Sequence, residues 1–418
     1  MLTIAGSGMT DYSVKELADR IDFKSFDFIY IDKNYLSNKR NEKYWSIDSQ
    51  KVIAGSFSDI LGGIIELLKG DKDKRLLYVV TGNPMFFSGA TILLDRIIQS
   101  IDGFKLESDV NIIGSDSCKD YLIRKLALAE QDMDVISLHG RSNIDLSRFL
   151  IKKYTFILAD KYTLSKLRDI LTYLNPDQYT VTLASKLGYI DGSIEIIDID
   201  DFLTSRPDID HLMPYVLLIE RKFKHKDLMS KESEFEKDSG MITKSYKRHL
   251  SLQELNLKAN LLMWDIGAGS GSVGIDAYKT YRIRVVFFEL KSKRAEDIRM
   301  NLKAHYVVGS RVLEGDFMEY IQKEKERPDR IFVGGGGDKS CTNLPVLYRI
   351  LKDGGILVAN YVAIEHMAKA VEILRKEDIS FSIKSLSLTT FKGTKFLLSE
   401  PERLMFQIKV GKSEGESY

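Results

Sequence analysis

Cysteine is scarce in this sequence. The only two, Cys118 and Cys341, lie far apart, and two distant cysteines provide neither a disulfide framework nor a metal-binding spacing. The six histidines are scattered as well, so we expect no metal site. Low cysteine usage suits a reducing compartment, and we predict a cytoplasmic protein.

An excess of charge of either sign is also lacking. Lys and Arg together number 61 and Asp and Glu 60, so the net charge is +1 and provides no general attraction to nucleic acid or a membrane surface. No apolar run approaches the roughly 20 residues that a membrane-spanning helix needs. The N-terminus has no basic segment ahead of an apolar core, as a signal peptide would have. We therefore expect neither nucleic acid nor a membrane as partner.

Short apolar runs alternate with amphipathic stretches in the first half of the 418 residues, a length typical of two or three domains. Expected strands cover residues 2–5, 28–31, 76–81, 110–114 and 156–159, and expected helices cover 57–69, 90–101, 118–129 and 164–174. This alternation predicts α/β layers with a largely parallel sheet. Three later runs, 180–183, 194–198 and 216–220, are expected to be antiparallel strands.

Residues 221–239 are highly charged and show no apolar period. We expect a linker there, between a domain over 1–220 and a domain over 240–411, with a solvated helix as the alternative. Expected strands of the second domain are 261–265, 285–289, 311–314, 330–333 and 355–359, then an antiparallel hairpin from 380–388 and 404–410, and a polar tail over 412–418. Such a series is typical of a class I methyltransferase, whereas a dinucleotide-binding fold would continue with another helix and parallel strand.

The segment 263–277, MWDIGAGSGSVGIDA, is the most informative. An apolar run ends at Asp265, and glycines follow at 267, 269, 271 and 274. Glycines at this spacing let the backbone turn tightly and approach a ligand, and the following helix would point its free N–H groups at it. We predict a nucleotide-cofactor loop whose contacts come from Asp265, Gly267, Ala268, Gly269, Ser270 and Gly271.

The ends of the next three strands indicate which cofactor. Glu289 ends the second strand, where an acid takes the ribose hydroxyls of S-adenosyl-L-methionine (SAM) or of NAD alike. Gly315 and Asp316 follow the third strand, where we expect an adenine ring. Four glycines, 334–337, follow the fourth strand, and we expect Gly334 and Gly335 to lie beside the transferable methyl with room for a bulky acceptor. The set favours SAM, and the lack of an Asn-Pro-Pro-Tyr type motif disfavours transfer to a base amino group.

Several of these segments together resemble the decarboxylating methyltransferase family of cobalamin biosynthesis. They are GMITK (240–244), DIGAGSGSVG (265–274), Glu289, EGD (314–316) and VGGGG (333–337), and the resemblance covers about residues 235–410. It implies a class I Rossmann-like fold, SAM as cofactor, and methylation of carbon 15 of a precorrin with loss of carbon dioxide from a ring acetate. It also implies that Thr243 contacts SAM, and a helix N-cap at this residue would be compatible with that contact.

The first half carries shorter motifs: GSG (6–8), VTGNPMFF (80–87) and SLHGR (137–141). Over about residues 1–215 they resemble the tetrapyrrole methylase family, class III methyltransferases that bind SAM between two α/β subdomains. The third motif points to the branch that methylates carbon 5. The resemblance implies cofactor contacts from Gly6, Gly8, Gly82, Asn83 and Pro84.

Two of these motifs depart from that family. Met9 and Thr10 stand where it has Pro-Gly, and Asn83 stands where it has Asp. Asparagine keeps the size and some hydrogen bonding of Asp but loses the charge. A non-enzymatic alternative for the first half is therefore a degenerate scaffold that binds the tetrapyrrole.

No Ser/His/Asp set or close carboxylate pair stands out, as expected if the protein mainly aligns the SAM methyl with an electron-rich ring carbon. The acceptor that the resemblance implies carries many carboxylates, which cationic side chains could bind. Lys244, Lys247 and Arg248 could bind them next to the cofactor, unless they form a solvated helix end. Arg141 offers a planar fork, or else a surface ion pair, and His139 is either functional or hydrogen-bonded in its loop.

We therefore predict an α/β protein in which a class III tetrapyrrole methylase domain is fused to a class I Rossmann-like methyltransferase domain with a terminal antiparallel hairpin. The resemblances imply a bifunctional precorrin methyltransferase that modifies carbons 5 and 15, and a homo-oligomer. One competing hypothesis is a class I RNA methyltransferase with an N-terminal binding domain, which the near-neutral charge and the lack of an arginine-rich patch disfavour. Another is an NAD-dependent oxidoreductase.

Overall fold

The computed structural model describes residues 1–32, 51–71, 73–138, 144–187, 191–204, 214–223, 229–238, 242–335, 337–394 and 396–413. The chain divides into two compact units. The first comprises Met1–Ser142, Lys152–Lys161 and Val181–Glu220, and the second comprises Asn143–Ile151, Tyr162–Thr180 and Arg221–Tyr418.

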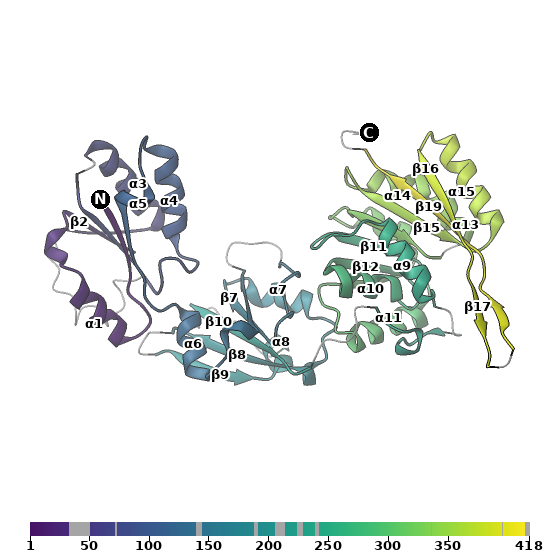
Figure 1. Cartoon of the computed structure of the whole chain (residues 1–418), viewed down its shortest axis with the longest axis horizontal. Helices are drawn as coiled ribbons and strands as arrows, with labels where there is room; N and C mark the ends of the chain where they lie inside the picture. The colour runs from purple at the N-terminus through teal and green to yellow at the C-terminus, as the bar shows by residue number, and fades with distance from the viewer. Residues whose placement is uncertain are drawn as a thin grey trace. The chain divides into compact units, whose positions relative to one another are not determined.

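The first sheet of the N-terminal half is parallel, as predicted, with strand order β3-β2-β4-β1-β5. Its strands are β1 (Leu2–Gly6), β2 (Phe28–Asp32), β3 (Val52–Gly55), β4 (Leu76–Val80) and β5 (Val110–Ile113), and its helices are α1 (Asp11–Arg20), α3 (Phe57–Gly70), α4 (Gly89–Ser100) and α5 (Leu106–Asp109). Helices α3 and α4 bury one apolar face of the sheet and α1 the other (Figure 1). This burial on both faces explains the continuous apolar runs of its central strands.

The second sheet has the order β6-β7-β10-β8-β9. It consists of β6 (Met133–Ser137), β7 (Tyr154–Leu158), β8 (Tyr179–Ser185), β9 (Ser193–Ile197) and β10 (Tyr215–Arg221), and the helices in this stretch of the chain are α6 (Cys118–Leu126), α7 (Thr163–Ile170) and α8 (Ile199–Thr204). Strand β10 runs antiparallel to β7, and β8 to β9. The prediction of antiparallel pairing late in the first half is therefore confirmed.

The C-terminal unit contains a seven-stranded sheet of order β13-β12-β11-β14-β15-β19-β16. Its strands are β11 (Leu262–Ile266), β12 (Arg284–Glu289), β13 (Arg311–Glu314), β14 (Arg330–Val333), β15 (Ile356–Tyr361), β16 (Phe381–Leu386) and β19 (Met405–Gly411). The first five are parallel, and β19 runs antiparallel to both β15 and β16. The expected α/β series with a terminal antiparallel pair is confirmed, and β19 lies between its two partners.

Helices cover both faces of this sheet (Figure 1). They are α9 (Ser245–Glu254), α10 (Ser272–Tyr281), α11 (Ser292–Ala304), α12 (Phe317–Ile321), α13 (Gly337–Thr342), α14 (Leu344–Ile350) and α15 (Ile364–Lys376). The main core cluster lies on the face of α13, α14 and α15 and includes the fully buried Trp264, Leu347 and Leu374. Because β11 to β15 are parallel, their carboxyl ends meet at one edge of the sheet, and the predicted cofactor residues lie at this edge.

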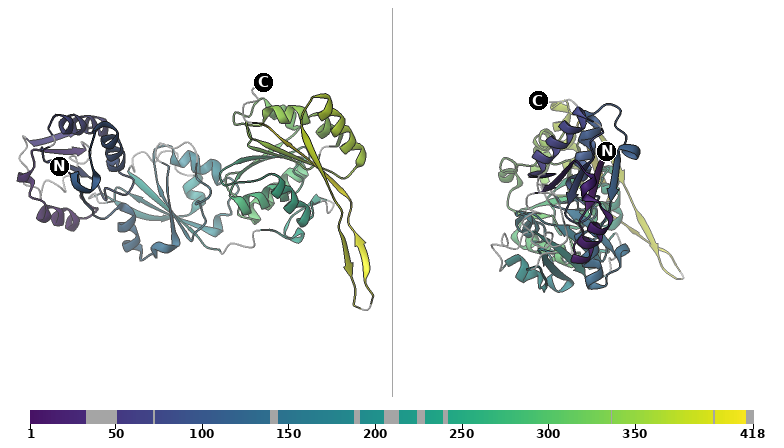
Figure 2. Two further views of the ribbon diagram at one scale, coloured as in Figure 1. Left: turned by 45° about the horizontal axis from the view of Figure 1, so that its top comes forward. Right: turned by 90° about the vertical axis from the view of Figure 1, so that its left-hand side faces the viewer.

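A two-stranded arm joins β16 to β19, between the two strands of the expected hairpin. It consists of β17 (Thr389–Lys392) and β18 (Leu398–Pro401), which pair antiparallel. The arm extends away from the sheet of its own unit (Figures 1 and 2). All eight of its strand residues are exposed.

The domain limits stay a prediction, and two groups of residues pack differently from what those limits suggest. Asn143–Ile151 and Tyr162–Thr180 group with the C-terminal unit, because the Leu146 N–H donates to Asn260 Oδ1 at 3.1 Å and the Gly309 N–H donates to the Ile170 carbonyl at 2.8 Å. Residues 229–238, expected to be part of a solvated linker, pack on the same unit. Phe235 there is 5% exposed and stacks on the His305 ring at 4.5 Å.

Candidate functional site

The cofactor loop connects β11 to α10 as predicted. Gly267, Gly269 and Gly271 all have positive φ, from 61° to 74°, a region that side chains with a Cβ rarely adopt. The N–H groups of Gly267 and Ala268 both donate to the Phe288 carbonyl, at 2.9 and 3.1 Å. The loop is thereby fixed to the end of β12, and α10 begins directly after Gly271.

The glycines of this loop differ in what surrounds them. A Cβ on Gly267 would lie 3.1 Å from the backbone of Gly335, and one on Gly274 would lie 2.4 Å from the Phe287 ring. A Cβ on Gly269 would meet no atom within 4 Å. Packing therefore explains the first two glycines, whereas Gly269 borders open space that a ligand could occupy.

Asp265 is 1% exposed at the end of β11. Its Oδ2 accepts the Gly274 N–H at 3.1 Å, and its Oδ1 has no hydrogen-bond partner. Burial, with a smaller contribution from the nearby Glu289, raises the pKa of Asp265 to about 7. A buried acceptor without a donor is costly, so Asp265 suits a cationic or hydrogen-bonding ligand group.

Glu289 closes the other side of the loop. Its Oε2 accepts the Gly269 N–H at 2.8 Å and its Oε1 accepts the Lys291 N–H at 3.0 Å. Each carboxylate oxygen can accept a further bond, so a role toward ribose hydroxyls is compatible with this geometry. The Gly315 N–H donates to the Glu289 carbonyl at 2.9 Å, which holds the predicted adenine position beside the predicted ribose position.

Asp316 caps helix α12 by accepting the Met318 N–H at 3.1 Å, and it pairs with Lys339 at 3.0 Å. The Met318 N–H and then Lys339 lower the pKa of Asp316. At the end of β14, the Gly334 N–H donates to the Ile266 carbonyl at 3.0 Å, and Gly335 lies against Gly267. The predicted residues of four strands thus meet at one edge; Gly336 lies outside the described residues.

These observations test whether SAM fits the C-terminal site. No protein atom occupies the space beside Gly269. No protein group donates a hydrogen bond to Oδ1 of Asp265. The following helix is ten residues long and points its first N–H groups toward the same loop. The residues present therefore fit a nucleotide-linked cation such as SAM.

Arg248 organises the segment that precedes this loop. It is fully buried, and its Nε donates to Asp276 Oδ2 at 2.6 Å. Its Nη1 donates to the Thr243 carbonyl at 2.6 Å and its Nη2 to the Ser230 carbonyl. The Ser230 N–H in turn donates to Asp276 Oδ1 at 3.1 Å. This buried pair joins the chain before α9 to helix α10.

Lys247 and Arg248, predicted to bind acceptor carboxylates, bind groups of the protein itself in this structure. Arg248 is committed to Asp276 and two carbonyls, and Lys247, 8% exposed, donates to the Arg403 carbonyl at 2.9 Å. Burial lowers the pKa of Lys247. Lys244 is exposed and is itself the N-cap residue of α9, so Thr243 is not that cap. Within GMITK, Gly240 and Met241 lie outside the described residues.

Asn301 is a structural residue that the sequence did not reveal. It is fully buried in α11, and its Nδ2 donates to the Glu236 and Ser270 carbonyls at 2.8 and 2.9 Å, while its Oδ1 accepts the Glu236 N–H. One side chain therefore ties the chain before α9 to the cofactor loop. Its partners lie 31 and 65 residues away, so no local pattern signals this role.

The predicted loops of the N-terminal half come together at the end of its first sheet. The Gly8 N–H donates to the Gly82 carbonyl at 3.2 Å, and a Cβ on Gly6 would lie 2.3 Å from the same oxygen and 2.6 Å from Pro84 Cδ. Asn83 Nδ2 donates to the Ser115 carbonyl at 2.7 Å. A carboxylate could not make this bond, which is a physical reason for Asn at this position.

Met9 and Thr10, which depart from the family pattern, both serve the fold. Met9 is 7% exposed and belongs to the core cluster of the second sheet, with Phe156 and Leu218. The Thr10 hydroxyl accepts the Ser13 N–H at 3.1 Å and so caps helix α1. His139 and Arg141 lie outside the described residues.

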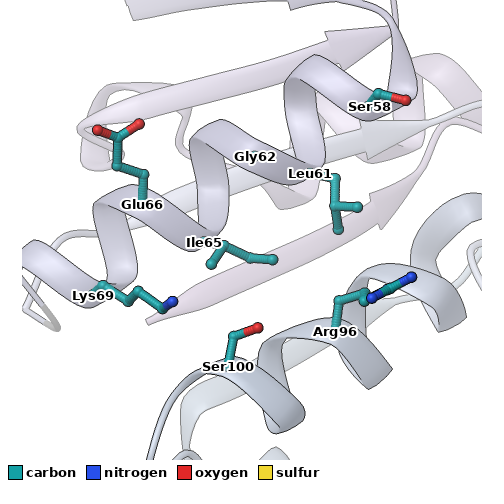
Figure 3. A pocket seen from close by; sticks show the side chains of 8 residues that line it. All are labelled: Ser58, Leu61, Gly62, Ile65, Glu66, Lys69, Arg96 and Ser100. Carbon is teal, nitrogen blue, oxygen red and sulfur yellow. The ribbon is translucent and has the colours of Figure 1, made fainter.

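Two surface pockets lie in the N-terminal half. One, of about 310 Å³, is mostly polar and adjoins Gly6 and Ser13 of the predicted site. The other, of about 510 Å³, lies between α3 and α4 (Figure 3), where Leu61 and Ile65 face Arg96 and Ser100. It contains none of the predicted residues, so its size alone assigns it no role.

The described residues contain neither a membrane-spanning helix nor a cluster of metal ligands. No described helix is long and apolar enough to cross a bilayer. Likewise, the described His, Cys, Asp and Glu side chains form no group of three that could hold a metal ion.

Comparison with known proteins agrees with this geometry. A family model described as "Precorrin methyltransferase domain" matches residues 233–387. The chain is 27% identical over 293 residues to a Sinorhizobium precorrin-6Y C(5,15)-methyltransferase [decarboxylating], covering 69% of this chain and 68% of that one. It is 30% identical over 169 residues to a probable cobalt-precorrin-6B C(15)-methyltransferase (decarboxylating) of Methanococcus vannielii, covering 40% of this chain and 88% of the relative.

Among solved structures, a precorrin-6y C5,15-methyltransferase from Geobacter metallireducens has 29% identity and a TM-score of 0.43, covering 45% of this chain and all of that one. The M. vannielii relative, at 30% identity, is covered over more than two thirds of its length. The family-model match begins ahead of α9 and includes the cofactor loop and the ends of β12 and β14. The chain belongs to the family of decarboxylating precorrin methyltransferases.

Proposed function

We propose that this chain is a two-site SAM-dependent enzyme of cobalamin biosynthesis. Its C-terminal domain, 240–411, methylates carbon 15 of a precorrin such as precorrin-6Y and removes carbon dioxide from a ring acetate. Its N-terminal domain, 1–220, is a class III tetrapyrrole methylase that methylates carbon 5. The observation that carries the proposal is the cofactor loop, with an open Gly269 and a buried acceptor on Asp265.

The roles of the residues follow from where they lie. When bound, SAM supplies an electrophilic methyl group on a sulfonium. Gly269 lets the backbone approach it, Asp265 offers a buried oxygen to its cationic portion, and Glu289 offers oxygens to its ribose. Gly334 and Gly335 leave space for the acceptor at the end of β14. The protein mainly aligns the two reactants and excludes water, so no strong base is required.

Two observations support a separate site in the N-terminal half. The match to the relative named for carbons 5 and 15 spans 293 residues, more than residues 221–418 contain, so it extends into that half. The half also has two five-stranded sheets, and Met9, which lies just after β1 of the first sheet, packs in the core cluster of the second. The side chain of Asn83 instead bonds to the backbone of Ser115 and Met85, which suits a scaffold that binds no cofactor. The number of SAM sites per chain separates these alternatives.

Calorimetric titration of SAM into the intact chain tests the proposal. Cutting the chain is unsuitable, because segments 143–151 and 162–180 pack with the C-terminal unit. We expect two sites. One site that disappears in the Gly269→Ala variant would assign the cofactor to the C-terminal domain alone, and no binding would contradict the proposal altogether.

Gly269→Ala should weaken SAM binding at the C-terminal site at least about tenfold, since its methyl would occupy the space reserved for the ligand. The matched control is Gly103→Ala, because Gly103 has φ of 73° and its Cβ would also meet nothing within 4 Å. Both variants carry the same positive-φ strain of about 1 kcal/mol. Equal SAM affinities in the two variants would contradict the assignment of Gly269.

We also propose that the chain forms a homo-oligomer through the β17–β18 arm. Phe391, Phe396, Leu397 and Leu398 are 61–82% exposed on it, and an isolated two-stranded hairpin is marginally stable in water. The free edges of two identical arms can pair with each other. We therefore assign a second copy of the chain as the arm's partner.

Phe396→Asp combined with Leu398→Asp should shift the wild-type oligomer toward monomer in sedimentation velocity, because each charge would have to be buried at the interface. Ile196→Asp is the control, since Ile196 is 71% exposed but lies on β9. A wild-type protein that is monomeric at micromolar concentration would refute the role of the arm.

A further inference from the structure

Val362 and Ile364 form an exposed apolar pair, called the apolar step below, which follows β15 at the edge where the cofactor residues meet. Val362 is 62% exposed and Ile364 is 57% exposed. Val362 follows the last residue of β15 and Ile364 is the first residue of α15, and β15 is the neighbour of β14. Two large aliphatic side chains thus face solvent directly beside the strand end that we assigned to the acceptor.

Close contacts connect this turn to the cofactor loop. Gly335 lies against Gly267, whose Cβ would be 3.1 Å from it. Two residues further on, a Cβ on Gly337 would lie 3.7 Å from His366 Cε1 in the first turn of α15. The described glycines of this segment therefore contact the cofactor loop through Gly335 and the first turn of α15 through Gly337.

Basic side chains accompany the apolar step. Asp338 lies 3.2 Å from Lys369 Nζ and 3.7 Å from His366 Nε2. Asp338 is 70% exposed, whereas His366 and Lys369 are 38% and 39% exposed. Glu365 is exposed nearby, and Lys339 is engaged by Asp316. Asp338 is the more exposed partner, so an incoming carboxylate can displace it from His366 and Lys369 or bind to them beside it.

We propose that Val362, Ile364, His366 and Lys369 form the acceptor subsite of the C-terminal domain. An apolar ring edge lies on the two aliphatic side chains, and a carboxylate on that ring binds His366 and Lys369. The ligand class is a flat, largely apolar ring with several carboxylates, and the inference rests on the proposed function. A second chain is a poor match, because two side chains fall far below the roughly 800 Å² per partner of a stable interface.

Uroporphyrin, a fluorescent tetrapyrrole carrying carboxylates, is the probe. Lys369→Glu should weaken its binding about tenfold, as expected for losing a charge-assisted hydrogen bond. His366→Gln should weaken it less. Val362→Ser combined with Ile364→Ser should weaken it about fivefold through lost apolar contact. The controls are Lys376→Glu, exposed in the last turn of α15, and Ile383→Ser on β16, 41% exposed.

SAM titration accompanies every variant and separates the two claims. Unchanged SAM affinity with weakened uroporphyrin binding in the subsite variants, but not in the controls, supports the subsite. Wild-type uroporphyrin affinity in Lys369→Glu and in the double Ser variant overturns it, and so does an equal loss in the controls. Failure of the wild-type chain to bind SAM would instead contradict the proposed function.

Discussion

Asp265→Asn should make the ligand-free protein more stable at pH 8 and, at the same time, remove most of its affinity for SAM. Burial raises the pKa of Asp265 from 3.8 to about 7. Between pH 3.8 and about pH 7, the Asp265 carboxyl is therefore protonated in the folded protein and ionised in the unfolded chain. Stability contributed by this group is fully present below pH 3.8, falls as pH rises toward 7, and is lost above it, by about 4 kcal/mol in total.

Asn cannot ionise, so the variant avoids this loss. Burying its unpaired N–H costs about 1–3 kcal/mol, which leaves a net gain of about 2 kcal/mol at pH 8 and almost none at pH 5. Urea denaturation across this pH range measures the difference, with the exposed Asp169→Asn as control. A variant that is less stable than wild type at pH 8 would show that Asp265 is already satisfied when ionised.

The same residue links pH to cofactor binding. SAM is cationic and favours an ionised neighbour, so its affinity at the C-terminal site should rise with pH up to about 7. It should then level off. In Asp265→Asn we expect at least about a tenfold loss of affinity and no such pH dependence. A pH profile identical in wild type and variant would remove Asp265 from the cofactor site.

The second large effect is expected at Arg248. Arg248→Met should destabilise the protein by about 3–5 kcal/mol, because it leaves the fully buried Asp276 without its cation. It also leaves the Thr243 and Ser230 carbonyls without their donors. Combining it with Asp276→Leu should recover much of this loss, since a buried ion pair replaced by apolar side chains is often neutral.

Arg349→Ala is the matched control for this experiment. Arg349 pairs with Glu377 at 2.5 Å, but its side chain is 54% exposed, and exposed pairs contribute about 0–1 kcal/mol. Urea denaturation gives the free energy of unfolding of all four proteins. A loss below 1 kcal/mol in Arg248→Met would contradict the structural role and return Arg248 to the list of candidates for acceptor binding.

The sequence predicted the parts of this fold that have strong local signals. Strands such as β4 and β11 are buried along their whole length, so their apolar runs are unmistakable. The glycine loop was identifiable because positive φ restricts its residue types. The resemblances, not the periodicity, provided the reaction and the acceptor.

The missed elements lack such signals. Strands β17 and β18 have no buried face and thus no alternation of apolar and polar residues. Helix α1 is short and polar, and its start depends on the Thr10 cap. The Arg248–Asp276 pair joins residues 28 positions apart, and such a pair is visible only once the chain has folded.

The most direct test of the central claim is the mass of the product formed from SAM and enzymatically prepared precorrin-6Y. The account predicts that the wild-type chain adds two methyl groups and releases one carbon dioxide per acceptor. At limiting SAM, Gly269→Ala should add less of the carbon 15 methyl and release less carbon dioxide, but it should add the carbon 5 methyl as the wild type does. Recovery of unmodified acceptor from wild-type protein that binds SAM would contradict the account.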